Sequence, residues 1–382
     1  MNNQISEIED IDNEENIESE RQSNETFDPR DIDISVEQQN IDYLIGKLED
    51  GEIDLNTEFQ RSTDLWDDGK MSRLIESLMV RFPVPGFYFD ITDKNNWQVV
   101  DGLQRLSALK KFIIDNKLKL KKLDFLNDIE GKNFKDLSYD DVYKHLIRTM
   151  KGTQIVLYLI RPGTPKAVKY RLYERINTGG LKLNSQEIRH ALNQGIAANY
   201  VEELSKLTEF QQVVRVYPTR MLDRELALRY VAFRETPYNQ YKPLLTEFLD
   251  EAMEKIASFS ERHKKELKQD FIKSITTAKE IFDKKAFRNI IKQNARYNRA
   301  LFETWTVNLS QLTDEERTLL VYNKEQVINK FESLLKKDKA FRDSISKGTS
   351  HLQAVNTRFY KIEQLIKDVL ENPSHLLGNN ND

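Results

Sequence analysis

The chain has 382 residues and a formal net charge of −4, with 39% hydrophobic residues, 31% charged residues and no cysteine. Its length suits about two domains of roughly 150 residues each, and no stretch approaches the ~18 consecutive apolar residues of a membrane-spanning helix. The lack of cysteine excludes disulfides, cysteine-containing zinc sites and thiol chemistry, and it fits a reducing cytosol. Together with the polar composition, these features lead us to expect a soluble, cytoplasmic protein without membrane contact.

The charge is unevenly distributed along the chain. Residues 1–29 contain ten of the 62 acidic residues and one of the 58 basic residues, which leaves 52 acidic and 57 basic residues in the remainder. A segment this acidic cannot bury enough apolar surface to fold, so residues 1–30 are expected to be a disordered leader without a signal peptide. The leader serves either to solubilise the protein or to compete with nucleic acid for a basic groove.

Hydrophobic periodicity predicts a mixed α/β domain over residues 31–181. Residues 34–50 are expected to form one helix, with Ser35 as its cap and Gly51 at its end. The next expected elements, in chain order, are an extended piece at 53–55, a helix at 68–81, strands at 87–91 and 97–100, a loop-rich segment at 123–146, a strand at 153–160 and a helix from residue 165.

The most informative stretch is the one in which the strand at 97–100 runs into Asp101 and Gly102, and a helical pattern follows at once. Asp is a preferred N-cap and Gly tolerates a sharp bend. The free N–H groups at such a helix start attract phosphate, and Arg105 in the first turn could bond two phosphate oxygens. In the alternative reading, Arg105 is a solvated surface residue. Asp101 either caps the helix or places Mg²⁺ or a water molecule.

Two further segments are candidates for phosphate contacts. Arg61 precedes the helix at 68–81, and a fold that brings it near Arg105 would let both arginines hold one phosphate group. After the helix from residue 165 comes Asn177-Thr178-Gly179-Gly180. Such a sequence forms either a helix C-terminal turn or a nest of backbone N–H groups.

Residues 182–382 are expected to form a second, helical domain. Its first helix begins with Asn184 and Glu187, which are spaced as in a capping box. Residues 255–299 contain thirteen basic and five acidic residues, so this region either follows a nucleic-acid backbone or is a solvated face over an aromatic core. The expected helices are at 184–194, 198–207, 222–235, 242–257, 261–285, 288–304, 312–318, 324–345 and 354–371.

Taken in order, several short motifs resemble the N-terminal domain of the GmrSD-type restriction endonucleases. The resemblance covers most of residues 35–235. The motifs are Phe59-Gln60-Arg61, Trp66, Arg73–Ser77, Pro83 with Pro85, Val100–Leu106, Arg175–Gly180, Leu183–Arg189 and Asp223–Arg229.

The resemblance implies an α+β fold: a ParB- and sulfiredoxin-like N-terminal domain with a small mixed sheet, followed by a mostly α-helical C-terminal domain. It also implies that nucleoside triphosphates are bound and hydrolysed with Mg²⁺. The family's Asp-Gly-Gln-Gln-Arg signature maps onto residues 101–105, where Leu103 replaces a glutamine and is expected to face the core. The implied catalytic residues are Asp101, Gln104 and Arg105, with Asp101 near Mg²⁺, and the implied nucleotide-binding residues are Arg61, Gly102, Arg105, Ser107, Asn177, Thr178, Gly179 and Gly180.

Many relatives carry a C-terminal HNH nuclease domain, but residues 236–382 lack its histidine pattern, and the chain has no Walker-type P-loop. The favoured interpretation is an NTP-binding and hydrolysing component of a prokaryotic, DNA-directed defence system. Its expected partners are a nucleoside triphosphate, double-stranded DNA, a separate nuclease subunit and a second copy of the chain. The alternatives are a DNA-binding or adaptor protein without turnover, and a metal-dependent DNA nickase that uses the ParB-like domain.

Overall fold

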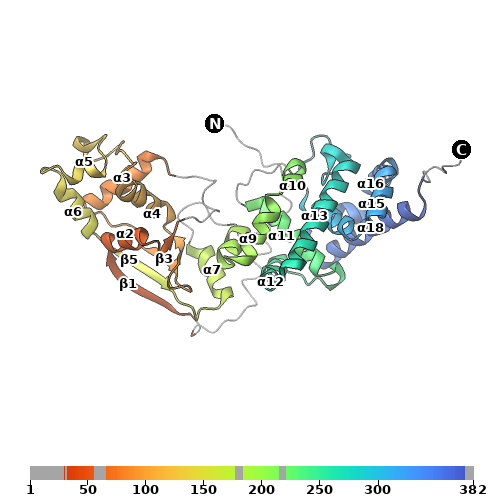
Figure 1. Ribbon diagram of the computed structural model, residues 1–382, viewed down its shortest axis with the longest axis horizontal. Coiled ribbons are helices and arrows are strands. Elements are labelled where there is room, and N and C mark those ends of the chain that lie inside the picture. The colour runs from red at the N-terminus through yellow and green to blue at the C-terminus, as the bar shows by residue number, and fades with distance from the viewer. Residues whose placement is uncertain (1–29, 31, 56–65, 177–183, 215–220, 375–382) are drawn as a thin grey trace. The chain divides into compact units, whose positions relative to one another are not determined.

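The computed structural model describes residues 30, 32–55, 66–176, 184–214 and 221–374 (Figure 1). Contacts divide the chain into two compact units, one ending at Leu192 and the other continuing from Asn193. The sequence placed this boundary at residues 181–182. In the described part of the chain, no helix has both the length and the apolar character needed to cross a membrane.

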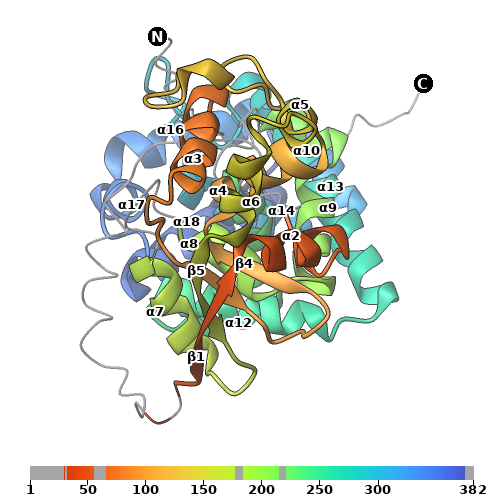
Figure 2. The same cartoon turned by 90° about the vertical axis from the view of Figure 1, so that its left-hand side faces the viewer.

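The first unit is built on a mixed five-stranded sheet with the strand order β1-β5-β3-β4-β2. Strands β1, β4 and β5 of this sheet are labelled in Figure 2. Strand pairs β1/β5 and β3/β4 are antiparallel, whereas β3/β5 and β2/β4 are parallel. This small mixed sheet, combined with a mostly helical remainder, confirms the predicted α+β class. The strands are β1 (Ile34–Asn40), β2 (Ile53–Asp54), β3 (Phe87–Asp90), β4 (Trp97–Asp101) and β5 (Gln154–Ile160).

The single helix predicted over residues 34–50 is wrong in its first half. Residues 34–40 form β1, which pairs with β5 from Ile34 opposite Ile160 to Asn40 opposite Gln154. Helix α2 (Ile41–Glu49) begins only after Asn40, whose side chain accepts a hydrogen bond from the N–H of Tyr43. Pairing with a strand more than a hundred residues away therefore decided the conformation of residues 34–40, against their local pattern.

One face of the sheet is covered by helices α2, α3 (Asp68–Met79), α4 (Leu103–Leu109) and α6 (Lys144–Gly152), which share a hydrophobic core with the strands. Helices α5 (Phe134–Ser138) and α6 extend into a segment that was expected to be loop-rich. The buried Glu76 carboxylate of α3 fixes a loop in this segment, because it accepts hydrogen bonds from the N–H groups of residues 124–126 at 2.7–3.0 Å.

Helix α7 (Lys166–Ile176) packs on the opposite face of the sheet. Side chains alternate between the two faces of a strand, so Asp90 of β3 lies on the face opposite Phe89 in the core. Lys169 of α7 donates a hydrogen bond to Asp90 at 2.8 Å, and both side chains are buried. Helix α8 (Ser185–Leu192) starts with the predicted reciprocal hydrogen bonds between Asn184 and Glu187.

The second unit is mostly helical. Two predicted helices differ in the structure: residues 288–298 are irregular and held by a bridge between Arg288 and Tyr297, and the helix at 324–345 is divided at Asp338. The helices are α9 (Ile196–Ser205), α10 (Thr208–Val213), α11 (Leu222–Glu235), α12 (Leu245–Ala257), α13 (Glu261–Phe282), α14 (Arg299–Ser310), α15 (Asp314–Tyr322), α16 (Lys324–Lys337), α17 (Lys339–Ser344) and α18 (Leu352–Glu371).

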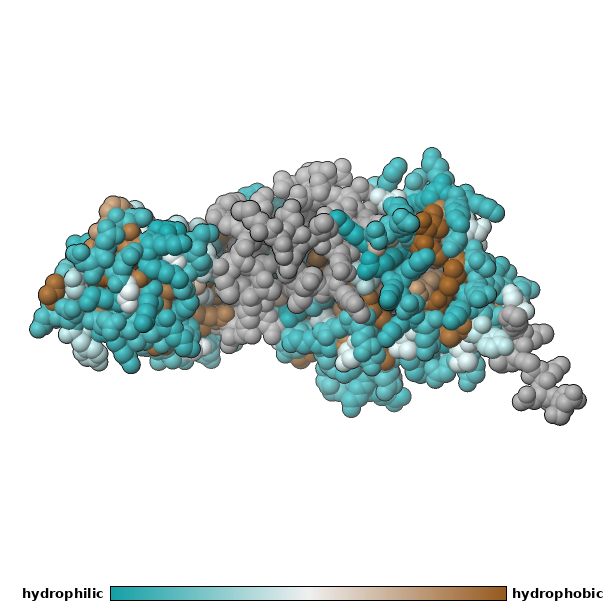
Figure 3. Space-filling model, turned by 90° about the horizontal axis from the view of Figure 1, so that it is seen from above, coloured by the Kyte–Doolittle hydropathy of each residue, from teal (hydrophilic) through white to brown (hydrophobic). Residues whose placement is uncertain are grey.

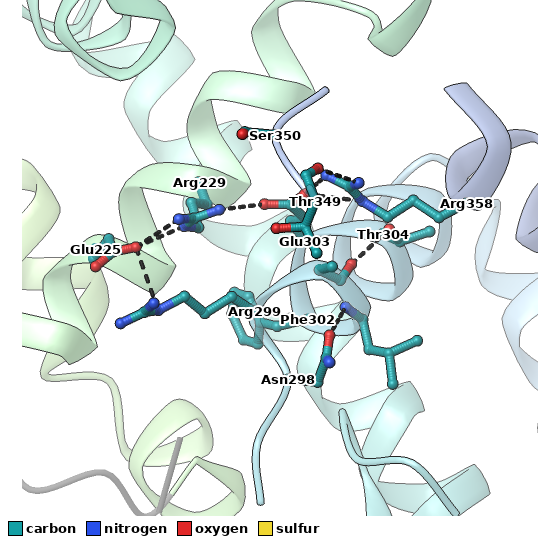
Figure 4. Close-up of polar contacts among 12 residues, drawn as sticks. Glu225, Arg229, Asn298, Arg299, Phe302, Glu303, Thr304, Thr349, Ser350 and Arg358 are labelled. Carbon is teal, nitrogen blue, oxygen red and sulfur yellow. Dashed lines mark hydrogen bonds and ion pairs between the residues drawn. The ribbon is translucent and has the colours of Figure 1, made fainter. Parts of the chain in front are cut away.

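A buried ion-pair network joins three of these helices (Figure 4). Glu303 of α14 has no exposed side-chain surface and accepts hydrogen bonds at 3.1 Å from Arg229 of α11 and from Arg358 of α18. Arg229 also donates to Glu225 at 2.8 Å, and the Arg299 guanidinium lies 3.5 Å from Glu225. Each buried carboxylate in this network is thus neutralised by at least one arginine, as buried charges require.

The outward-facing residues of both units are predominantly hydrophilic on the side seen in Figure 3. Several basic residues of α13 form ion pairs with acidic neighbours, such as Lys268 with Glu203 at 2.6 Å and Lys273 with Asp314 at 2.9 Å. These pairs favour the solvated-face interpretation for that helix.

Candidate functional site

The candidate site is the turn between β4 and α4. Gly102 is the N-cap residue of α4, with φ 106° and ψ 7°, and no side chain caps the helix there. Asp101 is therefore the last residue of β4 and does not cap the helix. Leu103, which stands where the family signature has glutamine, is 6% exposed and faces the core as predicted.

Glycine is required at position 102 for two reasons. Its positive φ lies in a region that residues with a Cβ rarely adopt. A Cβ built at this position would lie 2.5 Å from Phe87 Cδ1 and 3.2 Å from Arg105 Nη2. The bend thus brings the start of α4 against β3 more closely than any other residue would permit.

Arg105 is not the solvated surface residue of the alternative reading, because it is only 7% exposed. Its Nη2 donates to Asp101 Oδ2 at 2.7 Å and to the carbonyl of Gly86 at 3.1 Å, and its Nη1 donates to the carbonyl of Pro85. The guanidinium also lies 4.5 Å from the ring centre of Phe87. Arg105 therefore fastens the first turn of α4 to the loop that precedes β3.

The ion pair between Asp101 and Arg105 does not use all of the hydrogen-bonding capacity of the two side chains. Burial lowers the pKa of Arg105, and the neighbouring Asp101 carboxylate opposes that shift, so the guanidinium stays charged. Three of its five N–H donors are engaged by described residues. Asp101 uses Oδ2 for Arg105, its side chain is 34% exposed, and Oδ1 makes no hydrogen bond within the described part of the chain.

Gln104 and Ser107 lie on the same helix. The side-chain oxygen of Gln104 accepts a hydrogen bond from the backbone N–H of Trp66 at 3.2 Å, which joins α4 to the chain just before α3. Ser107 is half-buried, one helical turn after Leu103. The structure thus gathers Asp101, Gly102, Gln104 and Arg105 in one place, with Ser107 one turn further along.

Five predicted nucleotide-binding residues cannot be placed. Arg61 and the segment Asn177-Thr178-Gly179-Gly180 lie outside the residues that the structure describes. Convergence of Arg61 and Arg105 on one phosphate group therefore stays a prediction.

The sequence did not reveal an aromatic row beside this turn. Tyr88 of β3 and Tyr158 of β5 stack with ring centres 4.3 Å apart and planes inclined by 8°. The register places Val36 of β1 opposite Tyr158, Tyr158 opposite Tyr88, and Tyr88 opposite Asp101. Alternation in each strand places the tyrosines away from the core, but only the pairing of the strands brings them together.

At the β4–α4 turn, the Asp101 carboxylate is the group that would bind Mg²⁺. Among residues 30, 32–55, 66–176, 184–214 and 221–374, no group of three or more His, Asp or Glu side chains could hold a metal ion. Mg²⁺ is usually bound by one or two carboxylates together with waters and substrate phosphates. Asp101 with its available Oδ1 fits that mode, in which nucleotide and ion would enter together.

Comparison with known proteins agrees with the short motifs. Residues 41–193 match the family described as GmrSD restriction endonuclease, N-terminal domain. No curated protein and no solved structure matches the chain, so likeness to ParB and sulfiredoxin stays a prediction. The matched region ends at the boundary between the two units and contains the whole β4–α4 turn.

Proposed function

Because residues 41–193 belong to the GmrSD restriction endonuclease N-terminal domain family, we propose that this chain is a nucleotide-dependent component of a restriction-like defence system. In this proposal the first unit binds a nucleoside triphosphate and hydrolyses it with Mg²⁺. Duplex DNA, a separate nuclease subunit and a second copy of the chain are the proposed partners. The second unit would respond to DNA or to the nuclease.

The observation that carries the proposal is the combination of a free helix start with a paired carboxylate and guanidinium. The first hydrogen bond of α4 is donated by the N–H of Leu106 to the carbonyl of Gly102 at 2.9 Å. The N–H groups of residues 103–105 precede it and have no acceptor inside the helix. The adjacent ion pair of Arg105 Nη2 with Asp101 Oδ2, in which Asp101 Oδ1 makes no hydrogen bond to a described residue, completes a set suited to a polyphosphate with its cation.

Each side chain has a role in this proposal. The amides of residues 103–105 and Arg105 would hold phosphate oxygens, and Gln104 would orient the attacking water. Asp101 would hold Mg²⁺, which supplies charge neutralisation on the phosphates when bound. Hydrolysis would then rest on positioning and on stabilisation of charge, without a covalent intermediate.

A second candidate, a DNA-binding or adaptor protein without turnover, is favoured by one observation. Three of the five N–H donors of Arg105 are engaged by Asp101, Pro85 and Gly86. In this second reading, the motif only stabilises the fold, by holding α4 against the loop that precedes β3. A DNA nickase that uses this domain is the third reading. Phosphate release and DNA integrity, measured together, separate the three.

The test mixes the protein with each NTP, Mg²⁺ and duplex DNA, and compares Asp101→Asn with the wild type. We expect wild-type phosphate release and a loss of about 100-fold or more in the variant, as when one charge-stabilising group is removed. Asp115→Asn is the matched control, because Asp115 pairs with Lys110 at 2.7 Å further along the same helical segment. Its turnover should equal that of the wild type.

Three outcomes decide between the readings. Absence of both NTP binding and hydrolysis in the wild type overturns the proposal, and equal turnover in Asp101→Asn overturns the assigned site. DNA nicking that Asp101→Asn abolishes favours the nickase. Arg105→Ala is unsuitable for this test, because it removes three hydrogen bonds from a buried position.

A further inference from the structure

A row of side chains runs from the proposed phosphate site to the edge of the sheet. Asp101, Tyr88, Tyr158 and Val36 occupy paired positions on β4, β3, β5 and β1, and β1 is the edge strand. Neighbouring strands are about 4.8 Å apart, so the row extends roughly 14 Å from Asp101 to Val36. That length is comparable to an extended nucleoside triphosphate.

The aromatic pair within this row is electrostatically linked to the site. Burial raises the pKa of Tyr88, with further contributions from Tyr158 and from the Asp101 carboxylate, whereas Arg105 opposes the shift. The phenol of Tyr88 therefore lies close enough to sense both charges of the motif. One ring face of Tyr88 is turned toward Tyr158.

Tyr158 is half-buried, and its outer ring face, the one turned away from Tyr88, has no aromatic ring stacked on it among the described residues. Tyr88 covers the inner face at 4.3 Å, and the outer face is directed toward β1. There Val36 of the edge strand is 61% exposed. Helix α7 covers this sheet face one row further along, where Lys169 pairs with Asp90.

Tyr158 is also held rigidly by the segment that Arg105 fastens. A Cβ at Gly86 would lie 2.7 Å from Tyr158 Cε2, so the ring packs directly on the glycine backbone. The carbonyl of the same Gly86 accepts a hydrogen bond from Arg105. A single peptide segment thus fixes the phosphate-site arginine and the tyrosine ring relative to each other.

We propose that the outer face of Tyr158, above Val36, is a stacking subsite for the nucleobase of the nucleotide whose phosphates bind at the start of α4. This inference rests on the proposed function and adds a residue that distinguishes a nucleotide from bare phosphate. Every nucleobase has a π-face, so the subsite confers affinity for bases in general, as aromatic stacking platforms do.

The experiment compares two ligands, an NTP and inorganic tripolyphosphate, each with Mg²⁺, by calorimetry. Tyr158→Leu should weaken NTP binding by about 5- to 150-fold, the contribution of one stacked base, and leave tripolyphosphate binding unchanged. Tyr158→Phe keeps the ring and should bind both ligands like the wild type. Tyr139→Leu, at a position that is 86% exposed, is the control for loss of a tyrosine elsewhere in the same unit.

The outcomes separate this inference from the proposed function. If the wild type binds neither ligand, the proposed function fails. If both ligands bind and Tyr158→Leu affects neither, or affects both equally while the variant unfolds like the wild type, only the stacking subsite is refuted. Should the leucine variant fail to fold, Val36→Gln decides, because this exposed change should still weaken the NTP several-fold and spare tripolyphosphate, and equal binding refutes the subsite.

Discussion

Replacing Gly102 by alanine tests whether the β4–α4 turn depends on its close backbone approach. The added Cβ would lie 2.5 Å from Phe87 Cδ1, a separation that real Cβ atoms do not show. The Phe87 ring cannot move aside easily, because it is 1% exposed, lies parallel to Phe89 and contacts the Arg105 guanidinium.

The expected cost has two parts. A side chain held at a φ of 106° costs about 1–3 kcal/mol. Forcing an extra methyl group into a packed core costs about 1–3 kcal/mol. Gly102→Ala should therefore lower the free energy of unfolding of the first unit by about 2–6 kcal/mol.

Urea denaturation of the full chain, followed by circular dichroism and tryptophan fluorescence, measures this loss. Gly46→Ala is the matched control, because Gly46 lies inside α2 with nothing within 4 Å of a built Cβ. That change should stabilise the same unit by about 0.5–1 kcal/mol, since alanine is the better helix former. A loss below about 1 kcal/mol for Gly102→Ala would show that the close approach is not rigid.

Two further predictions concern buried charges in the helical unit. Glu303→Gln should lower the free energy of unfolding of that unit by about 3–5 kcal/mol, because Arg229 and Arg358 keep their buried charges and lose a shared carboxylate. Burial raises the pKa of Asp223, so the folded state binds more protons just above the ordinary pKa, and stability falls as pH rises through the raised value. Asp223→Asn should therefore be more stable than the wild type at neutral pH and lose this advantage in acid.

Denaturant midpoints measured across pH check both changes. Glu332→Gln, which removes an exposed pair with Lys336, should leave the midpoint where it is in the wild type. A Glu303→Gln variant as stable as this control would contradict the view that Glu303 compensates the buried charges of Arg229 and Arg358. An Asp223→Asn variant with the same pH profile as the wild type would show that the half-buried Asp223 carboxylate is solvated.

Local signals predicted much of the fold correctly. The β-rich runs at residues 87–90, 97–101 and 154–160 are strands, and a helix follows Gly102 at once. The capping pair Asn184 and Glu187 forms as expected, and Leu103 is buried. These features depend on residues within one turn or one strand, so the sequence contains the whole cause.

Other features arise from contacts between distant segments. Residues 34–40 carry no strong strand pattern and become a strand because β5 offers an edge. Residues 288–298 were read as helical, but backbone turns at Phe287 and Asn294, both with positive φ, prevent a helix. In each case packing outweighed a weak local preference, which is where propensity is least reliable.

The candidate site also combines features set by the local sequence with features set by contacts between distant segments. The sequence alone determined the Asp101-Gly102 bend, because the conformational freedom of glycine and the change from strand to helix pattern are local properties. Only the tertiary structure decided that Arg105 binds the carbonyls of Pro85 and Gly86, and that Tyr158 stacks on Tyr88 beside it. The order of strands in the sheet sets those contacts, and it follows from burial of apolar surface over the whole unit rather than from any single stretch of residues.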